Sequence, residues 1–213
     1  MNSESKYLRY IYHLSQGESK AGVTEVSRYA GVSKPAVTIM LRKLAADGLV
    51  DYFRYRPVSL TPKGVQLAIH YVRIHRIWET YLFEVLHLPL NRIHEEAELL
   101  EGSTSEYLLQ RLNHILRFPR FDPHGDPIPD KLGRIISCDH YLKLTDVVKN
   151  GKYRIVRTGH YRQQAIDFFV QERLFPNSIV TFLEKNDEII IQTGRKKLAI
   201  PAEFAAELFV IPG

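Results

Sequence analysis

The stretch TEVSRYAGVSKPAVTIMLRKLAAD, residues 24–47, decides the fold of the N-terminal part of this chain. Residues 24–30 have the apolar spacing of a short helix, the Gly-Val pair after them is typical of a turn, and residues 33–47 predict a second helix. Ser33 is a good N-cap for the second helix, and Gly48 directly after it suits a left-handed cap. The pattern predicts a helix-turn-helix.

The second helix has an inward face, because its apolar residues recur at the i, i+3, i+4, i+7 spacing. These residues are Val37, Met40, Leu41 and Leu44. Two short β-like runs follow, residues 49–53 and 58–60, with the basic triplet Arg54-Tyr55-Arg56 between them. Helix, turn, helix and wing in this order are typical of a winged helix-turn-helix, which presents its second helix to the DNA major groove.

The predicted DNA interface contains two kinds of residue. The exposed start of the second helix is where base edges are read, and it holds Ser33, Pro35, Ala36 and Thr38. Phosphates position the domain without specifying sequence, and the basic residues placed for them are Lys34, Arg42, Arg54 and Arg56. Tyr55 is a candidate for a sugar or minor-groove contact. Two alternatives remain: Ala36 only packs against the protein, and Arg42 pairs with a nearby acid.

The formal net charge of +5 is unevenly distributed over the 213 residues. Residues 1–75 carry 11 Lys and Arg against 5 Asp and Glu, whereas the remainder carries 18 against 19. The excess positive charge therefore lies where the winged helix is predicted, and it favours double-stranded DNA as a partner. A basic surface without a partner is the alternative.

The composition indicates a globular cytoplasmic protein. Hydrophobic residues make up 45% and charged residues 25%, which is ordinary for a globular chain. Cys138 is the only cysteine, which excludes an intrachain disulfide framework and fits a reducing compartment. No run is long enough to span a membrane, and no apolar signal region opens the chain. Because G-x-S-x-G, Walker and G-x-G-x-x-G motifs are also absent, we expect no enzyme.

Helical patterns fill most of the chain up to residue 116. The expected helices cover residues 6–15, 61–86 and 90–101, and Ser103-x-x-Glu106 is typical of a capping box that begins another. One face of this last helix holds Leu108, Leu112, Ile115 and Leu116. Helices outside a DNA-binding unit commonly build a dimer interface, so we expect a homodimer.

The C-terminal part has a different pattern. Residues 118–130 are rich in Pro and Gly and predict a linker. Beyond residue 141 the sequence predicts one helix at 163–174, a turn at Asn186-Asp187 and several short strands. The expected strands are residues 153–158, 179–183, 188–193 and 208–211. Short strands that close on themselves indicate a small β-barrel.

Candidate metal ligands lie on two of the expected helices. His75 and Glu79 are four residues apart, and His94, Glu98 and Glu101 follow the i, i+4, i+7 spacing, so each set shares one helix face. Imidazoles and carboxylates facing one another across two helices suit a divalent transition metal. The alternatives are a surface helix pair and a solvated acidic face. The run HEEAE begins like the H-E-x-x-H signature of zinc proteases, but Glu98 stands at the second His position, which argues against proteolysis.

The chain resembles the diphtheria toxin repressor family of metal-dependent regulators, which includes the manganese transport regulators. The matching stretches are YLRYIYHL (7–14), VSKPAVTIMLRKLAADGLV (32–50), LTPKG (60–64), HRIWE (75–79), HEEAELLE (94–101) and DPHGDPIP (122–129). The resemblance covers residues 4–130, and the C-terminal part is similar to the SH3-like domain of many members. It implies a homodimer that binds a palindromic operator when loaded with Mn(II) or Fe(II), with Zn(II) as a further candidate, and that represses metal uptake genes.

The fold class expected from pattern and resemblance is mostly α in the N-terminal two-thirds, with a small SH3-like β-barrel at the C-terminus. The winged helix-turn-helix is expected at residues 1–72. The helical dimerisation and metal-binding domain, with its Pro/Gly linker, is expected at 73–140, and the barrel at 141–213.

The family's metal ligands carry over in part. The resemblance implies an ancillary site made by His75, Glu79 and His94, and two ligands of a primary site, Glu98 and Glu101. Iron-responsive members have Cys where this chain has Glu98, and a hard oxygen ligand favours manganese. The barrel can complete the ancillary site, for which His160 and Gln163 are the candidates.

Three positions depart from the family pattern. Lys6 and Arg9 stand where members have ligands in the first helix, and Gly102 stands where they have a ligating His. Lys6 and Arg9 lie three residues apart on the helix face that should look at Glu98 and Glu101. We hypothesise that these two cations neutralise the two carboxylates and replace the primary metal. The alternative is that both cations point to solvent and that Gly102 only ends a helix before the Ser103 cap.

Three interpretations follow. The first is a metal-responsive repressor that uses the ancillary-type site, and the second is a related regulator that binds DNA without metal. The third is an enzyme or metal carrier with a vestigial DNA domain, against which the basic N-terminal part argues. Metal dependence of operator binding separates the first two.

Overall fold

The computed structural model describes residues 3–16, 21–54, 56–159, 162–185 and 188–213. The chain forms two compact units. The first consists of Met1–Tyr81, Glu95–Arg120 and Ile128–Ile135, and the second of Leu82–His94, Phe121–Pro127 and Ile136–Gly213. The domain boundaries expected from the sequence stay predictions. No helix among these described segments has the length and apolar character needed to cross a bilayer.

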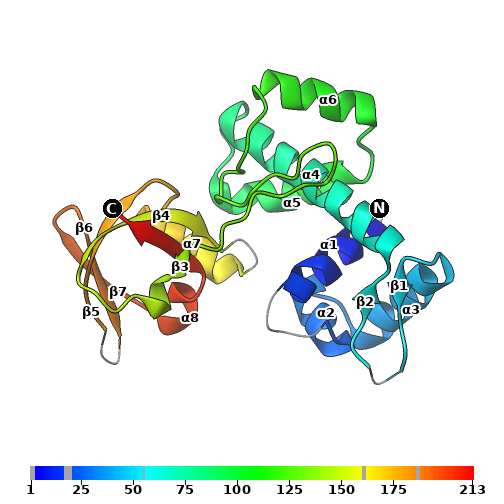
Figure 1. Cartoon of the computed structure of the whole chain (residues 1–213), viewed down its shortest axis with the longest axis horizontal. Helices are drawn as coiled ribbons and strands as arrows, with labels where there is room; N and C mark the ends of the chain where they lie inside the picture. Colours follow the sequence, from blue (N-terminus) through cyan, green and yellow to red (C-terminus); the bar gives the residue numbers. More distant parts are fainter. Residues whose placement is uncertain (1–2, 17–20, 55, 160–161, 186–187) are drawn as a thin grey trace. The chain divides into compact units, whose positions relative to one another are not determined.

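The N-terminal part has the predicted winged helix-turn-helix (Figure 1). Its elements are α1 (Ser3–Gln16), α2 (Val23–Ala30), α3 (Lys34–Ala46), β1 (Val50–Asp51) and β2 (Ser59–Leu60). Gly31 turns the chain between α2 and α3 with φ 65°, and the Ser33 side chain caps α3 by accepting a hydrogen bond from the amide of Ala36. The two wing strands pair antiparallel and are shorter than expected.

The core of the winged helix is built from α1, α3 and the start of the next helix, α4 (Pro62–Glu84). Val37, Leu41 and Leu44 are fully buried and Met40 packs beside them, which confirms the inward face predicted for α3. Gly64 lets α4 approach the wing, because a Cβ at this position would lie 1.9 Å from the carbonyl oxygen of Leu49.

Two further helices follow α4, namely α5 (Leu90–Glu101) and α6 (Glu106–Ile115). The predicted capping box of α6 is wrong, since Ser105 and not Ser103 caps it, accepting from the amide of Leu108 at 3.2 Å. Ser103 is held instead in the turn that ends α5, where its amide donates to the Leu100 carbonyl. The predicted apolar face of α6 is half right, because Leu112 and Leu116 are buried whereas Leu108 and Ile115 are exposed.

The Pro/Gly-rich segment after α6 is packed rather than loose. Asp122, His124 and Asp126 are buried, and the Asp122 carboxylate accepts hydrogen bonds from the amides of the other two. Phe121 and Pro127 form an isolated antiparallel bridge. The sequence composition alone therefore does not show how ordered this segment is.

The C-terminal part is an antiparallel sheet with the strand order β3-β8-β4-β5-β6-β7. Its strands are β3 (Leu142–Lys143), β4 (Gly151–Thr158), β5 (Ile179–Lys185), β6 (Ile189–Thr193), β7 (Lys196–Ile200) and β8 (Leu208–Pro212). Its helices are η1 (Leu144–Asp146), α7 (Gln163–Glu172) and α8 (Ala202–Ala205). The four predicted strands and the helix at 163–174 are confirmed, whereas β3, β7 and α8 were not expected. The predicted turn at Asn186-Asp187 lies outside the described residues.

The sheet is not closed into a barrel, so that detail of the expected SH3-like domain is wrong. In the described part of the chain, β3 pairs only with β8 and β7 pairs only with β6. β3 and β7 are therefore the two edges of the sheet. The sheet is instead covered by a core that includes Phe169, Phe182 and Leu208.

Candidate metal centre and nucleic-acid interface

The polar face of α1 meets the acidic face of α5 inside the first unit. Lys6 Nζ lies 2.8 Å from Glu98 Oε2, and Arg9 Nη2 lies 3.2 Å from Glu98 Oε1. Arg9 Nε lies 2.9 Å from Glu101 Oε2. The expectation that Lys6 and Arg9 face Glu98 and Glu101 is confirmed, and the alternative that both point to solvent is wrong.

These ion pairs differ in burial, and this decides their strength. The side chains of Arg9 and Glu101 are each 1% exposed, whereas Lys6 is 32% and Glu98 16% exposed. An opposite charge is attracted more strongly where water is excluded, but a buried charge also pays for its lost hydration. The stability of the fold therefore depends far more on the pairing of Arg9 with Glu101 than on the pairing of Lys6 with Glu98.

Tyr10 completes the contact between α1 and α5. Its hydroxyl donates to Glu98 Oε1 at 2.6 Å, and its ring meets the Tyr29 ring of α2 edge-on at 4.8 Å between centroids. Burial raises the pKa of the Tyr10 hydroxyl, and the charge of Glu98 together with this hydrogen bond raises it further. The hydroxyl therefore stays protonated and remains a donor to Glu98.

Glu101 is ionised in this arrangement. Burial raises the pKa of its carboxyl, but the hydrogen bond with His75, the charge of Arg9 and a hydrogen bond with Ser5 lower it by more, so the net shift is downward. The carboxylate can therefore accept hydrogen bonds from both α1 and α4.

His75 lies between two buried carboxylates. Its Nδ1 is 2.8 Å from Glu101 Oε2, and its Nε2 is 3.0 Å from Glu79 Oε1. His75, Glu79 and Glu101 are all buried, at 3%, 1% and 1% exposure. His75 and Glu79 on α4 therefore form an interior pair, and the alternative of a surface helix pair is wrong.

The residues His75, Glu79 and His94 form a group with the geometry of a metal site. Each offers one ligand atom, and these atoms lie within 4.8 Å of one another. Two imidazole nitrogens and a carboxylate oxygen suit Mn(II), Fe(II) or Zn(II). A carboxylate on the second ring nitrogen of a ligating His is the usual partner that orients it, and Glu101 holds that place on His75. The residues present therefore fit one divalent ion at this group.

The predicted primary-site ligands, in contrast, are not arranged to hold a metal ion. Glu98 and Glu101 direct carboxylate oxygens at Lys6, Arg9 and Tyr10, and Gly102 offers no side chain. Of the two residues considered for completing the ancillary site, His160 lies outside the described residues. The Gln163 amide donates to the Asn91 carbonyl and to the Asp167 carboxylate.

A basic concave surface of about 1150 Å³ lies between α2, α3 and the wing. Five of the predicted DNA-binding residues line it, namely Lys34, Thr38, Arg42, Arg54 and Arg56. Arg28 of α2 and Tyr52 also line it, and the sequence patterns missed both. A basic residue near the end of α2, close to the turn, was the available signal for Arg28.

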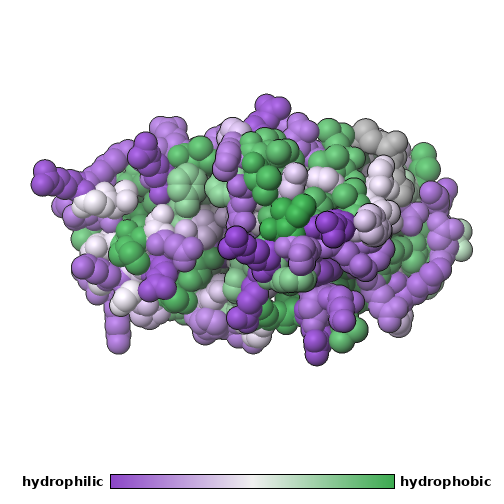
Figure 2. All heavy atoms as spheres, turned by 90° about the horizontal axis from the view of Figure 1, so that it is seen from above, coloured by the Kyte–Doolittle hydropathy of each residue, from purple (hydrophilic) through white to green (hydrophobic). Residues whose placement is uncertain are grey.

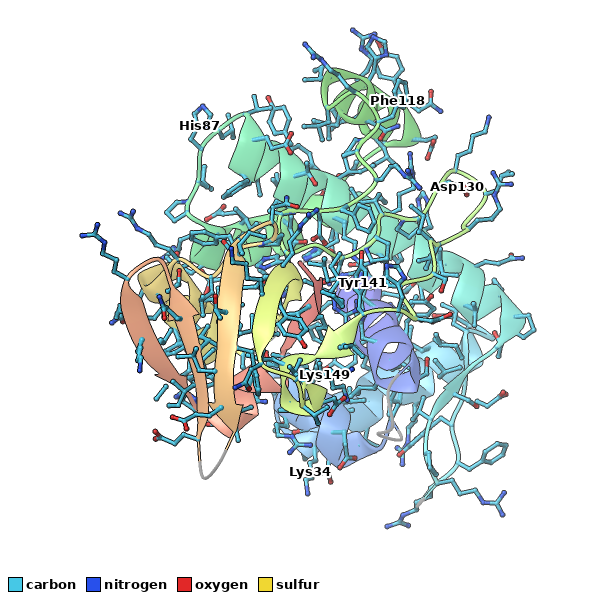
Figure 3. All side chains as sticks on the ribbon, turned by 60° about the vertical axis from the view of Figure 1, so that its left-hand side comes forward. Lys34, His87, Phe118, Asp130, Tyr141 and Lys149 are labelled. Carbon is cyan, nitrogen blue, oxygen red and sulfur yellow. The ribbon has the colours of Figure 1, made fainter. Side chains whose placement is uncertain are left out.

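The other predicted DNA-binding residues lie at the start of α3. Ser33, Pro35 and Ala36 are exposed, so the alternative that Ala36 only packs is wrong. Lys34, labelled in Figure 3, is exposed at the same end of α3. Within the described residues Lys43, rather than Arg42, approaches an acid, with Nζ 3.8 Å from Glu4. Tyr55 lies outside the described residues.

The winged helix and the buried imidazole and carboxylate cluster define a DNA-binding regulator with a candidate metal centre. Residues 1–58 match the family model of the iron dependent repressor N-terminal DNA binding domain. Residues 61–130 match that of the iron dependent repressor metal binding and dimerisation domain. The chain belongs to the iron-dependent repressor family of transcriptional repressors and is not an enzyme.

Individual relatives agree with this assignment. The iron-dependent repressor IdeR of Mycobacterium tuberculosis is 33% identical over 218 residues, which cover 96% of this chain and 95% of the relative. The diphtheria toxin repressor of Corynebacterium diphtheriae is 30% identical over 80% of this chain and 78% of its own length. A solved manganese-dependent transcriptional repressor in complex with manganese has a TM-score of 0.90 at 27% identity, covering 99% of this chain and 100% of that one. The family resemblance seen in the sequence is confirmed.

Proposed function

We propose that this chain is a homodimeric repressor that binds a palindromic operator in the cytoplasm, and that one divalent metal ion per protomer raises its operator affinity. The ion is Mn(II) or Fe(II), as in the relatives' names, held by His75, Glu79 and His94. The observation that carries the proposal is the convergence of these three ligand groups, which Glu101 links to α1 of the winged helix.

The charge of the cluster supports one ion rather than two. Three carboxylates (Glu79, Glu98 and Glu101) and two cations (Lys6 and Arg9) sum to one negative charge when the imidazoles ligate a metal ion and are therefore neutral. One divalent ion changes the sum to one positive charge, whereas a second would leave three positive charges among buried groups. Because an uncompensated buried charge is costly, the cations exclude a second ion from this place.

The metal dependence is tested with purified, chelator-stripped protein and its own promoter DNA. We expect Mn(II) or Fe(II) to tighten binding, and equilibrium dialysis to show one Mn(II) per protomer. His75→Gln should weaken metal binding by more than about 100-fold, because loss of an outer partner alone costs about 10–100-fold. His70→Gln, on an exposed position of the same helix, is the matched control and should bind metal normally.

A second candidate function is a regulator that binds DNA without metal. The contacts of Lys6 and Arg9 with Glu98 and Glu101 favour it, because they already hold α1 against α5. The same experiment decides between the two. Equally tight operator binding with and without each metal would support the metal-independent regulator and overturn the metal-responsive one.

The basic concave surface predicts how arginine substitutions act on DNA binding. Arg54→Gln should weaken binding to all DNA sequences alike and lower the slope of log affinity against log salt by about 1, because one phosphate contact is lost. Arg195→Gln, an exposed arginine far along the chain in the β6–β7 turn, should change neither quantity. The measurement is fluorescence anisotropy over a salt series. A loss confined to one operator sequence would contradict a phosphate role.

The exposed apolar side of α6 supports the homodimer. Figure 2 views the molecule from the α6 side and shows hydrophobic residues at its surface. The exposed apolar residues of α6 and the segment directly after it are Tyr107, Leu108, Ile115 and Phe118, at 75%, 40%, 55% and 62% exposure. Phe118 lies just beyond the end of α6 (Figure 3). Apolar patches of this kind mark interaction surfaces, and the family model that covers α6 names dimerisation.

A charge on this surface should dissociate the dimer. Ile115→Glu is expected to shift the protein to a monomer in analytical ultracentrifugation and to weaken operator binding by at least about tenfold, because the two half-sites no longer bind together. Val148→Glu is the matched control, an apolar residue that is 82% exposed elsewhere. A dimer that survives Ile115→Glu would place the interface away from α6.

A further inference from the structure

α1 has two faces that contact different parts of the first unit. Leu8 and Ile11 are fully buried in the winged-helix core together with Leu41 of α3. The opposite side of α1 presents Arg9, whose guanidinium contacts Glu98 and Glu101 on α5. A rearrangement on the α5 side therefore reaches the DNA-binding helices through the position of α1.

One oxygen atom joins the candidate metal centre to α1. Glu101 Oε2 lies 2.8 Å from His75 Nδ1 and 2.9 Å from Arg9 Nε. The other nitrogen of His75, Nε2, faces Glu79 within the metal-ligand group. All four of these side chains are buried, so water does not screen or replace the contacts.

The contacts continue from α1 to the helix-turn-helix. Tyr10 donates to Glu98, the second carboxylate that Arg9 contacts, and its ring packs edge-on against Tyr29 of α2. An unbroken series of contacts therefore runs from α4 to α2 through His75, Glu101, Arg9, Glu98, Tyr10 and Tyr29.

We infer that the shared oxygen of Glu101 couples the metal-ligand group to the DNA-binding helices; this inference rests on the proposed function. Both ring nitrogens of His75 face carboxylate oxygens, Nδ1 that of Glu101 and Nε2 that of Glu79. When Nε2 is a metal ligand, Nδ1 keeps the hydrogen and donates to Glu101. The Glu101 oxygen is then held where Arg9 meets it, and α1 is fixed. Without a metal ion, only the contacts with Glu79 and Glu101 position the ring.

The test uses two substitutions that leave the metal ligands in place. Glu101→Gln removes the charge at nearly constant shape, and Arg9→Lys keeps the charge but loses the guanidinium. Glu96→Gln on the same helix, outside the series of contacts, is the control. For each protein, Mn(II) stoichiometry is measured by electron paramagnetic resonance, and operator Kd is measured with chelator and with saturating Mn(II). Amide hydrogen exchange of α1 with and without Mn(II) is followed as a readout independent of DNA.

We expect wild type and Glu96→Gln to bind one Mn(II) per protomer and to bind DNA about 5–150-fold more tightly with it, the usual range of coupling between two sites. Their α1 amides should exchange more slowly with Mn(II). Arg9→Lys should still bind one Mn(II), and Glu101→Gln should bind one Mn(II) about 10–100-fold more weakly, because His75 loses its outer partner. In both variants at saturating Mn(II), the DNA-affinity ratio should be below about twofold, with no change in α1 exchange.

The outcomes separate the inference from the function on which it rests. If the wild type has the same operator Kd with chelator and with saturating Mn(II), or binds no Mn(II), the proposed function is overturned and this coupling with it. A wild-type ratio above about tenfold that persists in both variants overturns the coupling through Glu101 alone. If Glu101→Gln is too unstable to assay, Arg9→Lys decides the question, because it keeps the buried charge.

Discussion

Replacing Arg9 with methionine is expected to lower the free energy of unfolding by about 3–5 kcal/mol, because it leaves buried carboxylates without their cation. Arg9 and Glu101 are each 1% exposed, so water cannot take over the role of the guanidinium. Glu98 is 16% exposed and keeps Lys6, so the loss falls mainly on Glu101. Urea unfolding followed by circular dichroism measures the change.

Two further variants show whether this loss comes from the buried charge. Lys43→Met removes a pair whose lysine is 60% exposed and whose atoms are 3.8 Å apart, and it should cost less than about 1 kcal/mol. Arg9→Met combined with Glu101→Gln should recover part of the loss, because the buried carboxylate that lost its arginine is then uncharged. A cost for Arg9→Met no larger than that of Lys43→Met would show that Arg9 does not neutralise this cluster.

Restoring the family's ligand pattern is expected to create a second metal site. The triple variant Lys6→Met, Arg9→Glu, Gly102→His removes both cations and adds a carboxylate and an imidazole beside Glu98 and Glu101. Four carboxylates then balance two divalent ions, so Mn(II) binding should rise from one to two per protomer. Equilibrium dialysis gives the stoichiometry, and the melting temperature should rise with Mn(II), because ligand binding to the folded state stabilises it.

Gly102→His alone is the control for this experiment. It adds a ligand but leaves Lys6 and Arg9 on the carboxylates, so the stoichiometry should stay at one. If the triple variant is unfolded in chelator, folding driven by Mn(II) still reports the new site. A folded triple variant that binds no second ion would show that the two cations do not stand in for a metal.

Local sequence patterns were sufficient for the winged helix. The spacing of Val37, Leu41 and Leu44 fixed the inward face of α3, and Ser33 fixed its start, because helix periodicity and capping act within a few residues. The Arg and Lys excess in residues 1–75 likewise indicated the basic surface. The predicted α5, residues 90–101, has the same bounds as the observed Leu90–Glu101.

Sequence patterns gave wrong predictions where two residues were both able to cap a helix, and where the closure of a sheet depended on strands far apart in the sequence. Ser103 and Ser105 are both able to cap α6, and the turn at the end of α5 decided for Ser105. The SH3-like sheet stays open since β3 and β7 do not pair among the described residues, and neither strand has a feature in its own sequence that reports this. β7 begins with two exposed lysines, which concealed its strand character.

The sequence by itself determined which chemical groups share a helix face: Lys6 with Arg9, His75 with Glu79, and Glu98 with Glu101. Only the tertiary structure decided that α1, α4 and α5 bring these faces together, and that His75 and Arg9 meet at one oxygen of Glu101. The physical reason is that helix periodicity fixes directions over a few residues. Contacts between groups about 90 residues apart depend instead on how the apolar faces of the same helices pack.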